Sequence, residues 1–169
     1  VTYARELGIF CAVSSDGTNR VMTSTPPKQP STMSGAIFEI TSNNTTPGAI
    51  AWDTITEFGR TGNVISLSSS TITLEEAGTY MISGKVGVNV SNPSNFYFDF
   101  LYEDTDGTDK QIASMNMSGT GLMYSSIPIS FIETVTAGAL RRFVWSSTGT
   151  GTTPSILNDT RTQIQIVKL

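Results

Sequence analysis

The chain has 169 residues, among them 25 Thr and 21 Ser, and it carries one Cys, no His and a net charge of −4. Without His and with a single Cys, one chain cannot build a Ser-His-Asp or Cys-His centre or a cysteine metal cluster. The negative charge argues against nucleic acid, and no apolar run is long enough to span a membrane. We therefore predict no catalytic residues, no cofactor, no metal ligands, no nucleic-acid partner and no membrane insertion.

The first 34 residues differ from the rest and are predicted to form an N-terminal extension. Leu7, Ile9 and Cys11 occupy every second position, which favours a short strand. Asp16-Gly17 is a hairpin-turn signal before a return strand at 21–22. Three prolines between residues 26 and 30 cannot lie inside a sheet, so we expect a Pro-rich strap there. The predicted domains are this extension at 1–34 and a head at 35–169.

The first half of the head consists of short apolar stretches between turn residues, and its frequent Thr favours strands over helices. We expect strands at 37–40, 50–52, 64–67 and 71–74, with a turn at 43–48. A longer strand is expected at 80–90, because its apolar residues alternate with small or polar ones. One face of that strand carries Tyr80, Ile82, Val86, Val88 and Val90.

The second half of the head continues this pattern. We expect turns at 92–95 and 106–107, a flexible loop at 149–154, and strands at 96–102, 111–114, 122–135, 140–145 and 163–169. Pro128 requires an edge position or a bulge in its strand. The closing strand should be built into the sheet. Since no window shows an apolar helical stripe, we predict an all-β sandwich of eight to ten antiparallel strands.

Three segments resemble the tumour necrosis factor / complement globular-head family. They are LEEAGTYMISGKV at 74–86, FIETVTAGALRRFVW at 131–145 and IQIVKL at 164–169. The segment 52–67, with Phe58-Gly59, resembles the bacterial exosporium and phage-fibre branch of this group. The family usually has Gly-Asp in the tight turn before its penultimate strand, whereas here Ala139 follows Gly138.

The resemblance implies a ten-stranded TNF-like jelly roll that forms compact homotrimers. Members of this family bind receptors or cap trimeric stalks, and they are not enzymes. We therefore predict a homotrimeric viral or phage spike or fibre head, such as a tectivirus-type spike knob. It would bind a host-cell surface receptor, protein or glycan, from the virion surface or another extracellular position.

Two other functions remain open at the level of sequence. One is a trimerisation or stalk-capping domain of a bacterial surface or spore protein without a specific ligand. The other is a carbohydrate-binding sandwich that acts as a monomer.

Apolar residues on both faces of some strands indicate a second buried surface. Tyr97 and Leu101 lie opposite the Phe face of their strand, and Phe143 and Trp145 lie on the odd face of the next long strand. A monomeric sandwich buries one face of each strand, so these four residues are predicted to form a trimer interface. The alternative is that one aromatic face packs under the N-terminal strap.

Polar turns between strong strands are the predicted receptor-binding elements, because recognition residues commonly lie on loops that a rigid scaffold presents. The residues are Asn92, Asn95, Asp104, Asp106, Asp109 and Thr152. Three copies of a weak site on a trimer would act together by avidity. These loops carry no aromatic tip of the kind expected for sugar binding, which favours a protein receptor.

The acidic residues near 99–109 raise two further possibilities, metal binding and catalysis. The loop at 104–107 lacks the third oxygen ligand and the distal Glu of a calcium loop, so solvated carboxylates are favoured. Asp99 and Glu103 share a strand face roughly 13 Å apart, whereas a glycosidase pair needs about 5–9.5 Å. Neither pattern predicts a metal site or an active site.

Overall fold

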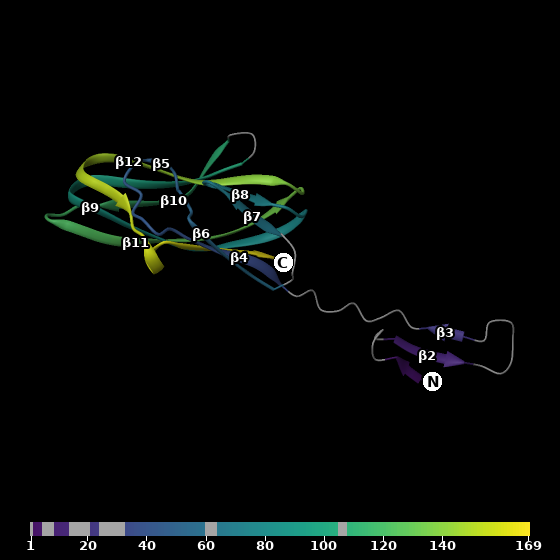
Figure 1. Cartoon of the computed structure of the whole chain (residues 1–169). Helices are drawn as coiled ribbons and strands as arrows, with labels where there is room; N and C mark the ends of the chain where they lie inside the picture. Colours follow the sequence, from purple (N-terminus) through teal and green to yellow (C-terminus); the bar gives the residue numbers. More distant parts are fainter. Residues whose placement is uncertain (1, 5–8, 14–20, 24–32, 60–63, 105–107) are drawn as a thin grey trace. The chain divides into compact units, whose positions relative to one another are not determined.

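The computed structural model describes residues 2–4, 9–13, 21–23, 33–59, 64–104 and 108–169, with side chains from residue 33 onward except 109 and 159. The chain divides into two compact units, Val1–Thr32 and Met33–Leu169 (Figure 1). In the first unit β1 (Thr2–Ala4), β2 (Ile9–Val13) and β3 (Val21–Thr23) form an antiparallel sheet. The pairing of β2 with β3 confirms the predicted hairpin strands, while Leu7, the turn at 16–17 and the strap lie outside the described residues.

The second unit is organised around β9 (Gly78–Glu103), a strand of 26 residues. Its first part, up to Ser91, pairs with β11 (Leu122–Val135) on one side and with β13 (Gln163–Lys168) on the other. Its second part, from Phe96, pairs with β10 (Asp109–Met117) and β12 (Ala139–Ile156). Because β9 changes partners along its length, it contributes to both layers of a sandwich (Figure 1).

The first layer has the order β6–β4–β13–β9–β11, where β4 is Ser34–Glu39 and β6 is Thr54–Phe58. Its strands are antiparallel, and β13 lies between β4 and the first part of β9. The closing segment is therefore built into the sheet, as predicted. Among the described strand pairings β11 pairs only with β9, so Pro128 lies on an edge strand, a position in which sheets tolerate proline.

The second layer contains β10, the second part of β9, β12, β8 (Thr71–Leu74) and β7 (Ile65–Ser68). The two-residue β5 (Gly48–Ala49) also pairs with β12. The short helix η1 (Asp159–Arg161), of the 3-10 type, joins β12 to β13. This all-β arrangement is the predicted sandwich.

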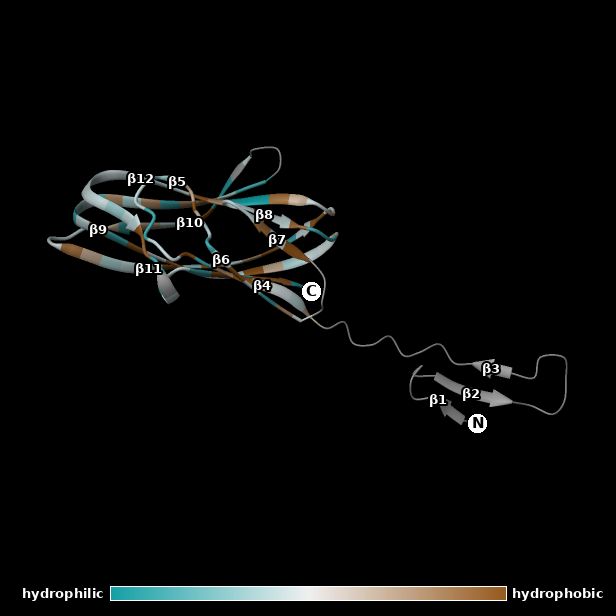
Figure 2. Ribbon diagram, in the orientation of Figure 1, coloured by the Kyte–Doolittle hydropathy of each residue, from teal (hydrophilic) through white to brown (hydrophobic). Residues whose placement is uncertain are grey.

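The core lies between the layers and follows from the alternation of the long strands (Figure 2). On β9, the even-numbered apolar residues from Tyr80 to Tyr102 are buried, as are Ile127 and Ile129 of β11. Trp52 lies in this core with its ring against Phe38 at 6.3 Å and Phe143 at 5.7 Å between centroids. It therefore packs between β4 of one layer and β12 of the other.

Several predicted boundaries were wrong. Residues 92–95 and 149–154, expected as a turn and a flexible loop, lie within β9 and β12. No strand forms at 50–52, although Ile50 and Trp52 are buried, and β6 forms where no strand was expected. Ile50 and Trp52 are apolar because they are buried, although they form no strand pairing. Turn residues at 92–95 and 149–154 lie in strands whose pairing is irregular. In both cases the apolar pattern of the sequence does not follow the hydrogen bonding of the sheet.

Candidate functional sites

One end of the sandwich carries three of the six predicted receptor-binding residues. Asn92 and Asn95 have φ values of 49° and 46°, a conformation that Asn tolerates better than most residues. Within β9 these two residues redirect the chain from one layer to the other. Asn92 is fixed there, because its amide donates to Gly121 O at 2.8 Å and its Oδ1 accepts from Gly121 N at 2.7 Å.

The same end is completed by two other segments. The Asn95 amide donates to Ser118 Oγ at 2.9 Å, and Thr152 of β12 is the register partner of Ser91. Asn92, Asn95 and Thr152 are all exposed. The structure therefore brings these three residues to one exposed surface, formed where β9 crosses between layers.

The acidic residues lie elsewhere. Asp104 forms an ion pair with Lys110 at 3.1 Å, and at about 3.3 Å per residue it is roughly 26 Å along the strand from Phe96. Asp109 is the register partner of Glu103, its side chain is not described, and Asp106 lies outside the described residues. The six predicted residues therefore do not form one site.

The neighbouring carboxylates already have partners within the second layer. Asp99 Oδ1 accepts from Gln111 Nε2 at 2.9 Å and from Ser114 Oγ at 2.7 Å, and Glu103 forms an ion pair with Arg142. Among the residues whose side chains are described, no group of three or more His, Cys, Asp or Glu could hold a metal ion.

The predicted interface residues belong to two different environments. Phe143 and Trp145 are 0% exposed in a single chain, so the prediction that they contact a partner copy was wrong. Their face of β12 points into the sandwich, where Phe143 packs on Tyr102 and Trp145 on Phe98. Tyr97 is 42% exposed and Leu101 is half-buried, both on the outer face of the second layer.

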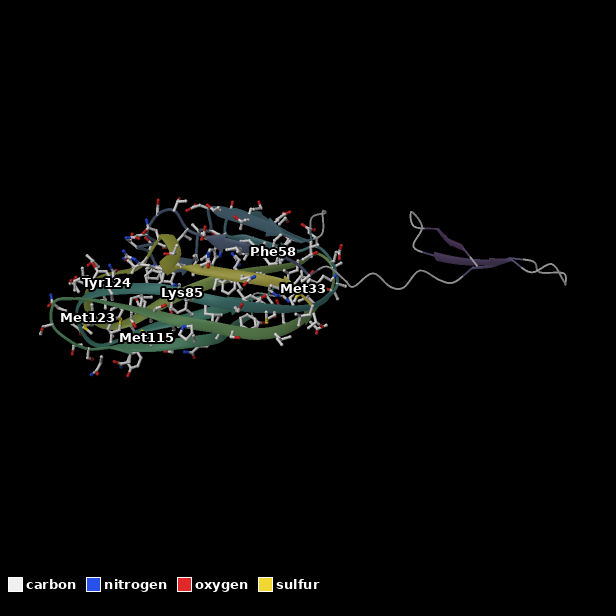
Figure 3. All side chains as sticks on the ribbon, turned by 90° about the horizontal axis from the view of Figure 1, so that it is seen from below. Met33, Phe58, Lys85, Met115, Met123 and Tyr124 are labelled. Carbon is white, nitrogen blue, oxygen red and sulfur yellow. The ribbon has the colours of Figure 1, made fainter. Side chains whose placement is uncertain are left out.

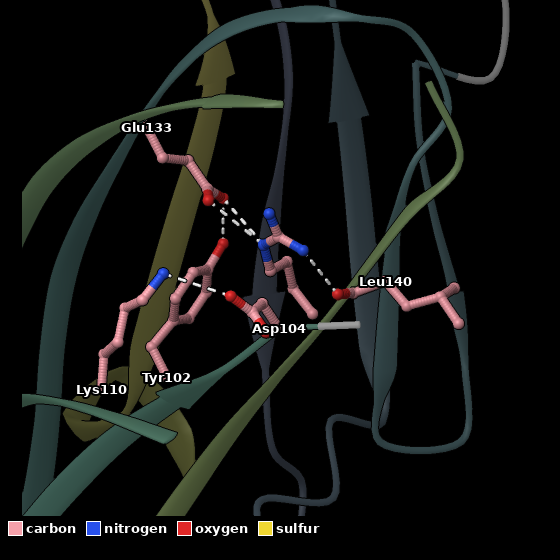
Figure 4. Close-up of polar contacts among 6 residues, drawn as sticks. Tyr102, Asp104, Lys110, Glu133 and Leu140 are labelled. Carbon is pink, nitrogen blue, oxygen red and sulfur yellow. Dashed lines mark hydrogen bonds and ion pairs between the residues drawn. The ribbon is translucent and has the colours of Figure 1, made fainter. Parts of the chain in front are cut away.

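A buried polar cluster links the two layers (Figure 4). Arg141 of β12 donates through Nε to Glu133 Oε2 of β11 at 3.1 Å, and Tyr102 of β9 donates its hydroxyl to the same carboxylate. Burial, together with the hydrogen bond and charge of Glu133, raises the pKa of the Tyr102 phenol well above its ordinary value, against the lowering effect of Arg141. Because these three side chains bind one another across β9, β11 and β12, the cluster holds the layers together.

A shallow polar pocket of about 360 Å³ lies beside β4. Its Asp53 accepts hydrogen bonds at 2.9 Å from both the amide and the hydroxyl of Thr41. The remaining lining residues carry hydroxyl, amide or small side chains, namely Ser42, Asn43, Asn44, Thr45, Thr46 and Ala51. Its one acid is already bound within the chain, so this pocket has no distinctive chemistry.

A larger groove, of about 590 Å³, was missed by the sequence analysis. We call it the cationic groove. It is lined by Lys85 and Gly87 of β9, Tyr124, Ser125 and Ser126 of β11, and Leu157 and Arg161 near η1. Figure 3 shows Lys85 and Tyr124 on one side of the sandwich, toward the end marked by Met123 and away from Met33 and Phe58. The sequence places Lys85 on an outward face but gives no sign that Arg161, 76 positions later, is its neighbour.

The outer face of the first layer is the most apolar surface described. Seven large apolar side chains are exposed in the described residues, and five belong to this layer or flank its strands: Met33, Leu122, Tyr124, Ile132 and Leu169. The register also aligns Phe58, Gly35, Val167, Met81 and Ile132 in one row across the five strands. The centre of the face carries small residues such as Ser83 and Ser130, which keep it flat.

Comparisons with solved structures identify the fold as that of the TNF-like jelly rolls. Murine APRIL at pH 5.0 is 12% identical, with a TM-score of 0.58 over 81% of this chain and 99% of that chain. Murine APRIL at pH 8.5 gives 0.56 with the same identity and coverage. The Eiger TNF structure from S. frugiperda is 12% identical, with a TM-score of 0.50 over 80% of this chain and 91% of that chain.

The sequence matches no protein-family model. It also has no significant match among curated proteins. The likeness to the APRIL and Eiger structures therefore establishes the fold. Within the described residues, no helix has the length and apolar character needed to cross a membrane.

Proposed function

We propose that this chain is the non-enzymatic, homotrimeric head of a viral or phage spike or fibre, which attaches to a host-cell surface receptor. The head is the unit Met33–Leu169, and the residues that precede it in the sequence form the extension. Its place is the virion surface or another extracellular surface. Recognition is assigned to the exposed end that carries Asn92, Asn95 and Thr152.

The observation that carries the trimer is the outer face of the first layer. Ile132 is 62% exposed at the end of the apolar row, and an isolated sandwich gains nothing from leaving such a residue in water. The part of the face around this row is apolar, which suits close packing against other copies, and Lys85 and the cationic groove lie toward the other end of the face (Figure 3). The outer face of the second layer carries the Glu103–Arg142 pair and Asp99, whose charges would have to be desolvated in an interface.

The oligomeric state tests this proposal directly. We expect light scattering of the full chain to give three times the 18.1 kDa mass of one chain. Ile132→Asp should shift the mass toward one chain, because it places a charge in the proposed interface. Leu140→Asp is the matched control, since Leu140 is 45% exposed on the second layer, and this variant should remain trimeric.

Two results would overturn the trimer or its placement. A wild-type mass of 18.1 kDa at all concentrations excludes the trimer. Dissociation by Leu140→Asp but not by Ile132→Asp moves the interface to the second layer.

The receptor-binding part has its own measurement. We expect fluorescently labelled trimer to bind host cells saturably, and excess unlabelled trimer to displace it. A double change of Asn95→Ala and Thr152→Ala should weaken this binding, while the mass stays unchanged. A trimer without saturable binding to cells would instead be a stalk cap.

A further inference from the structure

We propose that the cationic groove binds an anionic sugar residue, one with a carboxylate or a sulfate group. Lys85 and Arg161 would bind the acid, and Tyr124 with Ser125 and Ser126 would bind the ring and its hydroxyls. This inference rests on the proposed recognition function and adds to it a second binding site, whose lining residues differ from Asn92, Asn95 and Thr152. The groove volume of about 590 Å³ is within the usual range for small-ligand sites, about 300–1,000 Å³.

The ion pairs of the described residues are unevenly distributed. Six Lys and Arg side chains are described, and four of them pair with a carboxylate: Lys110, Arg141, Arg142 and Lys168. Lys85 and Arg161 are the other two, and no described carboxylate pairs with either of them. Both line the same groove. In a chain of net charge −4, this gives a local positive site with no acid among the described residues that line it.

Nearby acids do not neutralise these cations in the described structure. The carboxylate in register with Lys85 is Glu39, two strands away across Gln163. At about 4.8 Å between strands, Glu39 is roughly 10 Å distant, and it accepts a hydrogen bond of 2.6 Å from Gln163 Nε2. A ligand carboxylate or sulfate would meet less competition in the groove than at the four cations already paired.

Contacts with β9 hold the backbone around Arg161 in place. The Gly87 amide donates to Thr162 Oγ1 at 3.1 Å, and Gly87 O accepts from the Leu157 amide at 2.8 Å. A Cβ built on Gly87 would lie 2.8 Å from Arg161 Cβ, so only glycine lets η1 approach β9 this closely. Both ends of the η1 segment are thus tied to the strand that carries Lys85.

An aromatic residue lines the groove together with the two cations. Tyr124 is 57% exposed, although its ring is apolar, and it lines the groove together with two serines. The C–H face of a sugar ring packs on an aromatic ring, while hydroxyl groups on the protein fix its orientation. An anion without a sugar ring would contact only the two cations. An anionic sugar would contact the cations, the aromatic ring and the serine hydroxyls.

The test compares defined saccharides on the full chain. N-acetylneuraminic acid, glucuronic acid and glucose 6-sulfate are titrated while the amide resonances of Gly87 and Arg161 are followed by NMR. Lactose serves as the neutral sugar, and inorganic sulfate as the anion without a ring. We expect at least one acidic sugar to bind ten-fold or more tightly than both, with affinity falling as salt rises.

The variants separate the roles of the side chains. Lys85→Gln and Arg161→Gln should each weaken acidic-sugar binding about ten-fold, the loss expected for one charge-assisted hydrogen bond. Tyr124→Ala should lower sugar affinity but leave sulfate binding unchanged. Lys110→Gln is the matched control, because Lys110 is an exposed cation that pairs with Asp104 outside the groove. Asp159→Asn tests the acid closest to Arg161 in sequence, and it should leave binding equal or stronger.

Two outcomes overturn the inference: acidic sugars that bind no better than lactose and sulfate, or binding unaffected by both Lys85→Gln and Arg161→Gln. Light scattering of the same samples keeps the two proposals apart. A trimer that binds cells but no acidic sugar refutes the groove and retains the head. A monomer that binds acidic sugars refutes the trimeric head and retains the groove.

Discussion

Arg141, Glu133 and Tyr102 form a polar contact where the rest of the interlayer space is apolar. Arg141 is 9% exposed and its guanidinium carbon lies 5.7 Å from the Tyr102 ring centroid. Phe131 packs against the same ring at 4.9 Å. Because a buried carboxylate needs partners to remain charged, each member of the cluster depends on the other two.

Removing the cation from this cluster should be costly. We expect Arg141→Ala to lower the free energy of unfolding by roughly 3 kcal/mol, because it leaves Glu133 buried without its counterion. Urea unfolding at pH 7 measures this. Arg142→Ala is the control and should cost less than about 1 kcal/mol, since the Arg142 side chain is 46% exposed. Equal losses in both variants would contradict a special role for the buried pair.

The Tyr102 phenol predicts how stability changes in alkali. Its pKa in the folded chain is raised, chiefly by burial, above the unfolded value of about 10. The folded state therefore keeps this proton where the unfolded state loses it, so stability is full below about pH 10 and falls as the pH rises further. Tyr102→Phe should reduce this fall between pH 9 and 11.

In the Tyr102→Phe variant, Tyr80 should still make the stability fall somewhat as the pH rises. Burial, and then the charge of Glu76, raise its pKa as well. Urea unfolding at several pH values between 9 and 11 measures how the free energy of unfolding changes with pH in the wild-type chain and in Tyr102→Phe. An identical slope in the wild-type chain and in Tyr102→Phe would refute the assignment to Tyr102.

Single residues also show where sequence reasoning stops. Alternation places Phe143 and Trp145 on one face of their strand, but it does not say whether that face is internal. The opposite face carries Leu140 and Val144, so hydrophobicity alone does not settle the choice. What determines it is the packing of Phe143 on Trp52, a contact between residues 91 positions apart.

At the scale of elements, the strongest predictions came from the long alternating strands. The predicted strand at 122–135 matches β11, and 163–169 matches β13 to within one residue. The junctions were harder to predict, because Asn92, Asn95 and Thr153 adopt positive φ values inside continuous strands. In this protein the turn-forming residues therefore occur where a continuous strand bends. The same residue types form free loops in other proteins, so the sequence alone does not distinguish the two cases.

The central position of β13 can be tested with two adjacent residues. Ile166 is 0% exposed and faces the core, whereas Gln165 points to the outer face. We expect Ile166→Ala to cost about 2–5 kcal/mol and Gln165→Ala less than about 0.5 kcal/mol. Chemical denaturation of the two variants measures the difference. Similar small losses would show that β13 is not a central strand in solution.

At the scale of the whole molecule, the fold could be predicted further than the sites. The three segments that resemble the family lie on β9, β11, β12 and β13, the strands that define the sandwich. The cationic groove could not be found in this way, because it joins Lys85 to Arg161 through the pairing of β9 with the η1 segment. Site residues that lie on separate segments can be recognised as neighbours only once the pairing of those segments is known.

A trimer makes thermal stability depend on protein concentration. Since association stabilises the folded chain by mass action, we expect Tm to rise by several degrees between about 1 and 100 μM. Ile132→Asp should abolish this dependence, and Leu140→Asp should preserve it. Circular dichroism melts at several concentrations provide the measurement. A Tm independent of concentration in the wild-type chain would argue for a monomer.

The position of β13 also has a consequence for biosynthesis. β4 and β6 are synthesised first in the head, but β13, which joins them to β9, comes after every other strand. A growing chain therefore displays two incomplete half-layers, with unpaired edges on β4 and β9, until β13 leaves the ribosome. The first layer can therefore close only after β13 has been translated, and until then the edges of β4 and β9 are open to pairing with other chains.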